Sequence, residues 1–258
     1  LFSLTSLTQT SVAMEMEFEK RGNHTCLILD KSVVYKKGNV NFRVEKTKNT
    51  EHSFDTLSSE SYDSPYESIV NEIDGRSRVI DTKLTPYSFN GHLITTFEDG
   101  TTGYGSGTIV GNNHVLTAGH NILDKKHGWA KSVKFVPGRN EKLTPFGEVK
   151  GTRIYTFEEW AKNRLVCYDM ALVTLDQPIG KKTGYADIML SQDGSKLLGK
   201  DVKISGYPGD KNPKYETDKW QMWTMTKKIR GSNCHRIFYD IDTYEGQSGS
   251  GILEDHGD

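Results

Sequence analysis

The feature that most constrains the fold is a series of short apolar runs that begins near Ile69 and continues along the chain. Gly, Pro, Asn and Asp separate these runs, and regular short strands divided by turn residues predict an all-β sandwich or barrel. One helical turn, Thr156–Lys162, is expected at the surface. The expected strands are His92–Phe97, Gly107–Val110, His114–Thr117, Ser132–Val136, Met170–Leu175, Val202–Ser205, Trp220–Met225 and Arg236–Ile241.

The sequence before these runs has a different texture. Residues 14–67 are polar, rich in Ser, Asp and Glu, and poor in apolar periodicity, which predicts a weakly structured extension or linker. The apolar, Ser/Thr-rich start up to Ser11-Val12-Ala13 fits either the end of a secretory signal or a frayed terminus. We therefore expect an extension over residues 1–67 and one globular domain over residues 68–258.

Composition excludes several classes of partner. The chain has 258 residues and a formal net charge of −1, which gives no reason to expect nucleic acid or an anionic membrane as a partner. No apolar run reaches the roughly 18–20 residues that cross a bilayer. Cys26, Cys167 and Cys234 are isolated from one another and from histidine at zinc-ligand spacing, so we expect neither a metal nor a cofactor.

Three polar residues stand in contexts that suit nucleophilic catalysis. His120 follows Ala-Gly at the end of an apolar stretch, Asp169 heads the apolar run of "CYDMALVTL", and Ser248 lies inside "YEGQSGSGIL". A neutral imidazole can take a serine proton, and a carboxylate can fix its tautomer and stabilise the imidazolium. Each residue alone is weak evidence. Together, in the order His, Asp, Ser on a many-stranded background, they predict a catalytic triad.

The glycines around Ser248 suit the same chemistry. Glycine is favoured where the backbone needs positive φ or close approach. Gly246, two places before the serine, would let its own N–H and that of Ser248 point together at a developing oxyanion.

The segments "TAGHN", "YDMALV" and "GQSGSG" resemble the three signatures of trypsin-like serine proteases, which have the two-barrel chymotrypsin fold. The resemblance is closer to the secreted bacterial glutamyl endopeptidases, through "DGRSRVIDTKLTPY", "VPGRN", "PFGEVKGTRI", "DQPIGKKTGY", "ISGYPGDK" and "YDIDTYEGQSGSG". It implies two antiparallel six-stranded β-barrels with the active site in the cleft between them. It also implies a secreted, monomeric endopeptidase without cofactors, acting on proteins or peptides, with His120 as general base, Asp169 as its orienting carboxylate and Ser248 as nucleophile.

The resemblance also bears on specificity. In glutamyl endopeptidases a Thr or Ser five residues before the nucleophile lines the primary pocket, and here that residue is Thr243. Cleavage after Lys or Arg needs an acidic pocket floor, usually one residue earlier, where Asp242 stands. We favour cleavage after Glu or Asp and keep basic specificity, and a strand role for Thr243, as alternatives.

Three departures from the family pattern matter. Glu245 and Gly251 replace the usual Gly and Pro, and the sequence stops at Asp258, before the strand that would complete the second barrel and carry a specificity histidine. His256 comes too early for that role. A catalytically inactive relative that binds peptides is therefore the second functional hypothesis.

The family resemblance begins near Ser68, directly after Glu67. In the resembling family the mature amino terminus helps form the pocket for the substrate carboxylate. We therefore expect a precursor in which residues before Ser68 act as a propeptide, the Ser68 ammonium binds substrate, and the Glu67–Ser68 bond is a candidate for self-cleavage.

Overall fold

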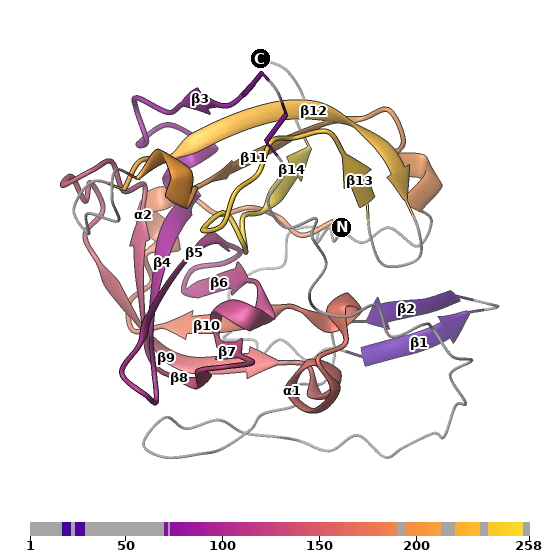
Figure 1. The fold of residues 1–258 in the computed structure, drawn as a ribbon, viewed down its shortest axis with the longest axis horizontal. Coiled ribbons are helices and arrows are strands. Elements are labelled where there is room, and N and C mark those ends of the chain that lie inside the picture. The colour runs from indigo at the N-terminus through magenta and orange to yellow at the C-terminus, as the bar shows by residue number, and fades with distance from the viewer. Residues whose placement is uncertain are drawn as a thin grey trace.

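The computed structural model describes residues 17–21, 24–28, 70–71, 73–189, 194–212, 220–232 and 237–254. Strands dominate these residues, and helices are short. The expected all-β class is confirmed, with the chymotrypsin-like arrangement of a barrel and a second sheet (Figure 1).

The first unit is a closed antiparallel barrel. Its strands follow the order β4-β5-β6-β10-β9-β8, and pairing of β4 with β8 closes the ring. The short strand β7 adds to the edge of β8. The strand bounds are β4 Asn90–Phe97, β5 Thr102–Ile109, β6 His114–Thr117, β7 Leu123–Asp124, β8 Gly128–Pro137, β9 Val149–Thr156 and β10 Ala171–Leu175.

The barrel closes around an apolar interior. Phe135, Ile109, Val115 and Val173 have no exposed surface. Alternate residues of a strand face opposite sides, so each strand contributes about every second side chain to this interior. At about 1.5–3 kcal/mol for each large apolar side chain that is buried, this cluster is the main stabilisation of the first unit.

The second unit is a sheet of five strands within the described residues. Its order is β13-β12-β11-β14, and β3 pairs with β12. Figure 1 shows this sheet on the opposite side of the molecule from β7–β10. The bounds are β3 Ser77–Arg78, β11 Asp201–Gly206, β12 Trp223–Ser232, β13 Ile237–Tyr239 and β14 Ile252–Glu254.

Helical segments connect these strands. The helical turn lies at the surface as expected, with Lys162 and Asn163 exposed, and it packs one fully buried ring, that of Trp160, into the protein. Their bounds are α1 Glu158–Asn163 and α2 Gly180–Thr183, with 3-10 turns η1 Tyr87–Phe89, η2 Gly119–Asn121, η3 Val166–Tyr168, η4 Gly194–Leu197 and η5 Gly209–Lys211.

Two short strands lie in the region that we expected to be weakly structured. Strands β1 (Glu17–Arg21) and β2 (His24–Ile28) pair antiparallel. The rest of the extension, including Glu67, lies outside the described residues, and so does Ser68 at the start of the expected domain.

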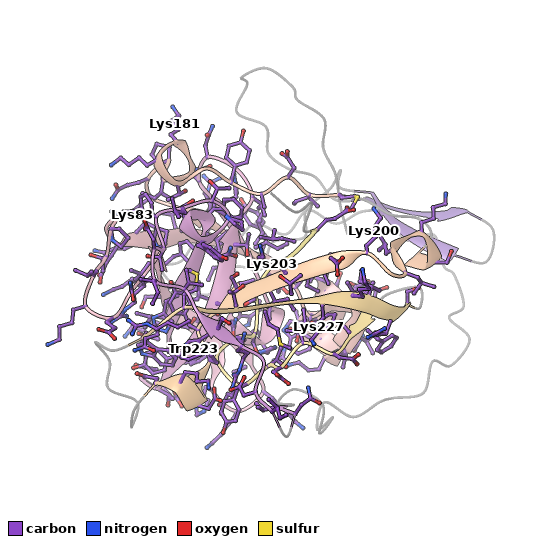
Figure 2. All side chains as sticks on the ribbon, turned by 90° about the horizontal axis from the view of Figure 1, so that it is seen from above. Lys83, Lys181, Lys200, Lys203, Trp223 and Lys227 are labelled. Atoms are coloured by element: carbon purple, nitrogen blue, oxygen red, sulfur yellow. The ribbon has the colours of Figure 1, made fainter. Side chains whose placement is uncertain are left out.

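The labelled lysines are spread over several elements (Figure 2). Lys83 and Lys181 lie away from Lys203 of β11, Lys227 of β12 and Lys200, which directly precedes β11. Lys228, beside Lys227, forms an exposed ion pair with Asp201.

Candidate active site

Strand pairing brings His120 and Asp169 together. Strands β6 and β10 are antiparallel neighbours in which Thr117 pairs with Ala171. The residues that follow β6 and those that precede β10 therefore lie at the same edge of the barrel. His120 is in η2 just after β6, and Asp169 ends η3 just before β10.

Both oxygens of the Asp169 carboxylate hold His120. The imidazole Nδ1 lies 2.7 Å from Oδ2, and the His120 backbone N–H donates to Oδ1, also at 2.7 Å. Both side chains are mostly buried, with 17% and 14% exposed. Because an ionised carboxylate only accepts, this contact places the proton on Nδ1 and leaves Nε2 with the lone pair.

Gly119 explains the small residue before the histidine. A Cβ on Gly119 would lie 2.8 Å from Cδ1 of Trp160 and 2.9 Å from Oδ1 of Asp169. Only glycine lets the chain approach this closely, so the buried indole of α1 packs against the residue directly before His120.

The Ser248 loop of the second sheet reaches the same edge. The Ser248 carbonyl accepts hydrogen bonds from the backbone N–H of Ser106 (2.9 Å) and from Nδ2 of Asn121 (2.8 Å). A Cβ on Gly249 would lie 2.2 Å from Oγ1 of Thr117 and 2.8 Å from the backbone N of Ala118. The structure thus brings the Ser248 loop against the chain on either side of His120.

Several hydrogen bonds fix the turn that leads to Ser248. The N–H of Gln247 donates to the carbonyl of Tyr244 (3.0 Å), and the Gln247 side-chain oxygen accepts from the N–H of Tyr244 (3.0 Å). Gly246 has φ +98°, and its carbonyl accepts from Oγ of Ser106 (2.8 Å). We name this turn, residues 244–248, the oxyanion turn after the role expected for Gly246 and Ser248.

Sequence reasoning missed the residues that hold this turn. Ser106 belongs to "GYGSGTI", where it resembles an ordinary strand residue, and its hydroxyl also accepts from the N–H of Tyr207 (3.0 Å). Asn121 directly follows His120 and could have been noticed for its position. Gln247 was visible only as part of the family signature.

Asp242 is completely buried and already has partners. Its Oδ1 accepts from the N–H of Asn71 (2.9 Å) and from the Asn71 side-chain amide, and its Oδ2 accepts from the N–H of Gly75 (2.7 Å). Burial by itself raises the pKa of Asp242, but these hydrogen bonds outweigh it, and the net pKa is lowered. The carboxylate is therefore ionised and occupied by the protein's own donors.

Two of the other residues with expected roles lie between Asp242 and Ser248. Thr243 is half-buried beside Asp242, and Glu245 is exposed, with its carbonyl accepting from the N–H of Gly209 (2.7 Å). Ser68 and His256 lie outside the described residues.

Comparison with protein families decides the family. The model of the trypsin-like peptidase domain matches residues 105–258. The chain belongs to this family. The match includes the His120, Asp169 and Ser248 segments and leaves out β3 and β4.

Curated relatives place this trypsin-like domain in the branch that contains the glutamyl endopeptidases. A glutamyl endopeptidase of Bacillus licheniformis is 36% identical over 182 residues, which are 70% of this chain and 53% of the relative. An extracellular metalloprotease of Bacillus subtilis is 31% identical over 186 residues, 72% of this chain and 57% of the relative. The chain thus spans a little over half the length of these two relatives.

Solved structures agree with this trypsin-like fold. A Glu endopeptidase in complex with MPD has a TM-score of 0.64 at 30% identity, covering 72% of this chain and 82% of that one. The protease Anisep from Arthrobacter nicotinovorans has a TM-score of 0.54 at 19% identity, covering 70% and 82%, and supports the fold alone.

Two further findings on the described residues concern metals and membranes. The name of the Bacillus subtilis relative implies a metal in that protein. In the part of this chain that the structure describes, no group of three or more His, Cys, Asp or Glu side chains is arranged to hold a metal ion. Within the same residues, no helix is both long and apolar enough to span a membrane.

Proposed function

We propose that the protein is a serine endopeptidase that hydrolyses peptide bonds through an acyl-enzyme. The observation that carries the proposal is the contact of both Asp169 oxygens with His120, which fixes the ring and leaves Nε2 free of a proton. In the first step Nε2 takes the proton of the Ser248 hydroxyl while Oγ attacks the scissile carbonyl carbon. The imidazolium then gives this proton to the leaving amine. Water next attacks the acyl-enzyme ester while giving a proton to Nε2, and the imidazolium returns that proton to Oγ of Ser248 as the acid product leaves.

The oxyanion turn supplies the electrostatic part of this mechanism. In the turn, the N–H of Gln247 is used internally, whereas no described group accepts a hydrogen bond from the N–H of Gly246 or Ser248. These two groups are the proposed donors to the tetrahedral oxyanion. Preorganised donors of this kind lower the barrier without reorganising during the reaction.

We place the preference of the enzyme at Glu, or Asp, before the scissile bond. The buried contacts of Asp242 argue against the basic alternative, because a Lys or Arg side chain would have to displace Asn71 and Gly75 from the carboxylate. Thr243 and the amino group of Ser68 are the proposed substrate contacts. The branch to which the relatives belong supports this choice.

Labelling with a fluorophosphonate tests the proposal against an inactive, peptide-binding relative. Wild-type protein is expected to react covalently at Ser248, and Ser248→Ala is expected to remain unlabelled. Wild-type protein that has not been treated with the reagent should cleave a peptide with Glu before the scissile bond faster than the matching peptide with Lys. Absence of labelling in folded protein would support the binding module, and faster cleavage after Lys would overturn the specificity.

We further propose that the protein is secreted and made as a precursor, and that residues 1–67 are removed from the protease domain at 68–258. Amino-terminal sequencing of secreted, active enzyme is expected to give Ser68. A Ser248→Ala precursor, expressed alone, should stay uncut if the Glu67–Ser68 bond is cleaved by the enzyme itself. A mature start far from residues 68–71 would contradict the boundary, and normal processing of Ser248→Ala would contradict self-cleavage.

A further inference from the structure

A short segment before the barrel is docked on the second sheet. The segment consists of Asn71 and residues 73–78, and we refer to it as the amino-terminal strap. Its strand β3 pairs with the start of β12, through Arg78 with Trp223 and Ser77 with Thr224. The hydrogen bond from Val79 N–H to the Met222 carbonyl (2.9 Å) continues this pairing.

The first anchor of the strap is the buried Asp242 carboxylate. It accepts from two backbone N–H groups of the strap, those of Asn71 and Gly75, at 2.9 and 2.7 Å. Space beside Gly75 is limited, because a Cβ there would lie 2.6 Å from Cε of Met225. Asp242 lies immediately before Thr243 and the oxyanion turn, so this anchor fixes one end of the catalytic loop.

The second anchor is Arg76, whose side chain has no exposed surface. Its guanidinium donates to Asp74 through Nε (2.9 Å) and Nη2 (2.8 Å). It also donates to both oxygens of Asp210, from Nη1 at 3.1 Å and from Nη2. A planar guanidinium can bind two carboxylates in this way, whereas a lysine ammonium cannot reproduce the bidentate geometry.

Asp210 belongs to η5, and η5 supports the oxyanion turn. The N–H of Gly209 donates to the carbonyl of Glu245 at 2.7 Å. A Cβ on Gly246 would lie 2.5 Å from the carbonyl oxygen of Tyr207 and 3.2 Å from the Gly209 nitrogen. The two anchors therefore reach the turn from both sides: Asp242 along the chain, and Arg76 through Asp210 and Gly209.

We propose that Asp242 and Arg76 are positioning residues that hold the oxyanion turn in its catalytic shape by tying it to the amino-terminal strap. This assigns Asp242, which sequence reasoning kept as a candidate pocket floor, to the support of the turn. The inference rests on the proposed serine-protease function for its kinetic consequence, although the coupling between strap and turn does not depend on activity.

Hydrogen exchange of the processed chain tests the coupling directly. In Asp242→Asn one acceptor oxygen becomes an NH₂ group, which must face the N–H of Asn71 or that of Gly75. One of these hydrogen bonds is therefore lost, and the strap is loosened. Exchange is expected to rise about 10-fold or more at the bonded amides of Gly209, Gln247 and Ser250, a loss of local protection of about 1.4 kcal/mol. Exchange in β10 should not change. Asp240→Asn is the matched control, because the Asp240 side chain is 62% exposed and pairs only with Arg230 among the described residues.

Kinetics separates positioning from simple loss of stability. Rates are divided by the number of active sites titrated with an acylating reagent, so that unfolded molecules do not count. For Asp242→Asn and for Arg76→Lys, kcat per titrated site is expected to fall about 10–100-fold. This fall is smaller than the one expected when an oxyanion donor is removed outright. KM for a Glu substrate should change less than about 3-fold.

The outcomes are distinct. Increased exchange confined to the strap, with Gly209 and Gln247 still protected, would overturn the proposal, as would an unchanged kcat per titrated site. A large rise in KM with unchanged kcat would overturn the positioning role of Asp242 and would support a role in the substrate pocket. If wild-type protein is not labelled by fluorophosphonate, the proposed function fails, and the exchange experiment still decides whether strap and turn are coupled.

Discussion

Asp169 directs both oxygens to a single residue, and this makes the amide substitution informative. Asp169→Asn can present an NH₂ group to Nδ1 and so favours the tautomer that protonates Nε2. We expect kcat to fall about 10⁴-fold, and His120→Ala or Ser248→Ala to lower it about 10⁴–10⁶-fold. Steady-state assays on folded variants check this, with exposed Asp187→Asn as a control that keeps wild-type turnover. Comparable turnover in Asp169→Asn would contradict the triad.

Gly246 and Gly100 separate two reasons for a glycine. Both have positive φ, +98° and +85°, but a Cβ on Gly100 meets nothing within 4 Å, whereas one on Gly246 meets the Tyr207 carbonyl at 2.5 Å. Gly100→Ala is expected to cost about 1 kcal/mol of unfolding free energy from the backbone alone and to keep activity. Gly246→Ala must also displace the oxyanion turn, so activity should fall at least about 100-fold. Denaturant unfolding and turnover measure the two effects, and equal activities would show that the turn tolerates the shift.

Among the elements, β5 contacts the second sheet and its loops in several places, and the Ser106 hydroxyl makes two of these contacts. Ser106 Oγ donates to the Gly246 carbonyl and accepts from the Tyr207 N–H, and both contacts are buried. Ser106→Ala leaves these groups unpaired, which we expect to cost about 1–3 kcal/mol of unfolding free energy and to lower kcat as well. The exposed Thr152→Ala in β9 is the control, since its hydroxyl contacts only the Thr174 carbonyl among described residues. Loss of stability with normal kcat per active site would limit Ser106 to a structural role.

The strands that could be predicted are those with a continuous apolar run. The expected runs fall on β4, β5, β6, β8, β10, β11, β12 and β13. Strand β9, "VKGTRIYT", was missed because charged and small residues interrupt its apolar pattern. Only Val149 and Ile154 of this strand are buried. Helix α1 was placed correctly at the surface, but nothing local reveals that its Trp160 ring packs beside Gly119. The His120–Asp169 pair was predictable from motif order, whereas the strap contacts of Asp242 depend on residues about 170 positions apart.

On the scale of the whole molecule, a buried histidine lies where the barrel meets the second sheet. The His92 ring of β4 stacks on Tyr104 at 5.6 Å between centroids and lies 4.4 Å from the Trp220 ring. Its Nδ1 lies 3.1 Å from Nη1 of Arg139, which can only donate, so the ring is neutral with its proton on Nε2. Burial, and secondarily the charge of Arg139, lowers the pKa of His92 well below 6.5.

This shift makes the stability of the molecule depend on pH. In the unfolded chain His92 takes up a proton near pH 6.5, whereas the folded protein takes it up only at a much lower pH. The contribution to stability is therefore complete above about pH 6.5 and is lost as the pH falls, by up to about 1.4 kcal/mol per pH unit. His114, whose pKa is also lowered by burial, adds a smaller effect of the same sign. Denaturant unfolding between pH 8 and 5 should show the decline. The decline should be flatter in His92→Gln, which keeps an acceptor for Arg139, than in the wild type or in His127→Gln, which changes a partly exposed histidine. An NMR titration in which His92 protonates near pH 6.5 in the folded protein would contradict this account directly, even if His92→Gln fails to fold.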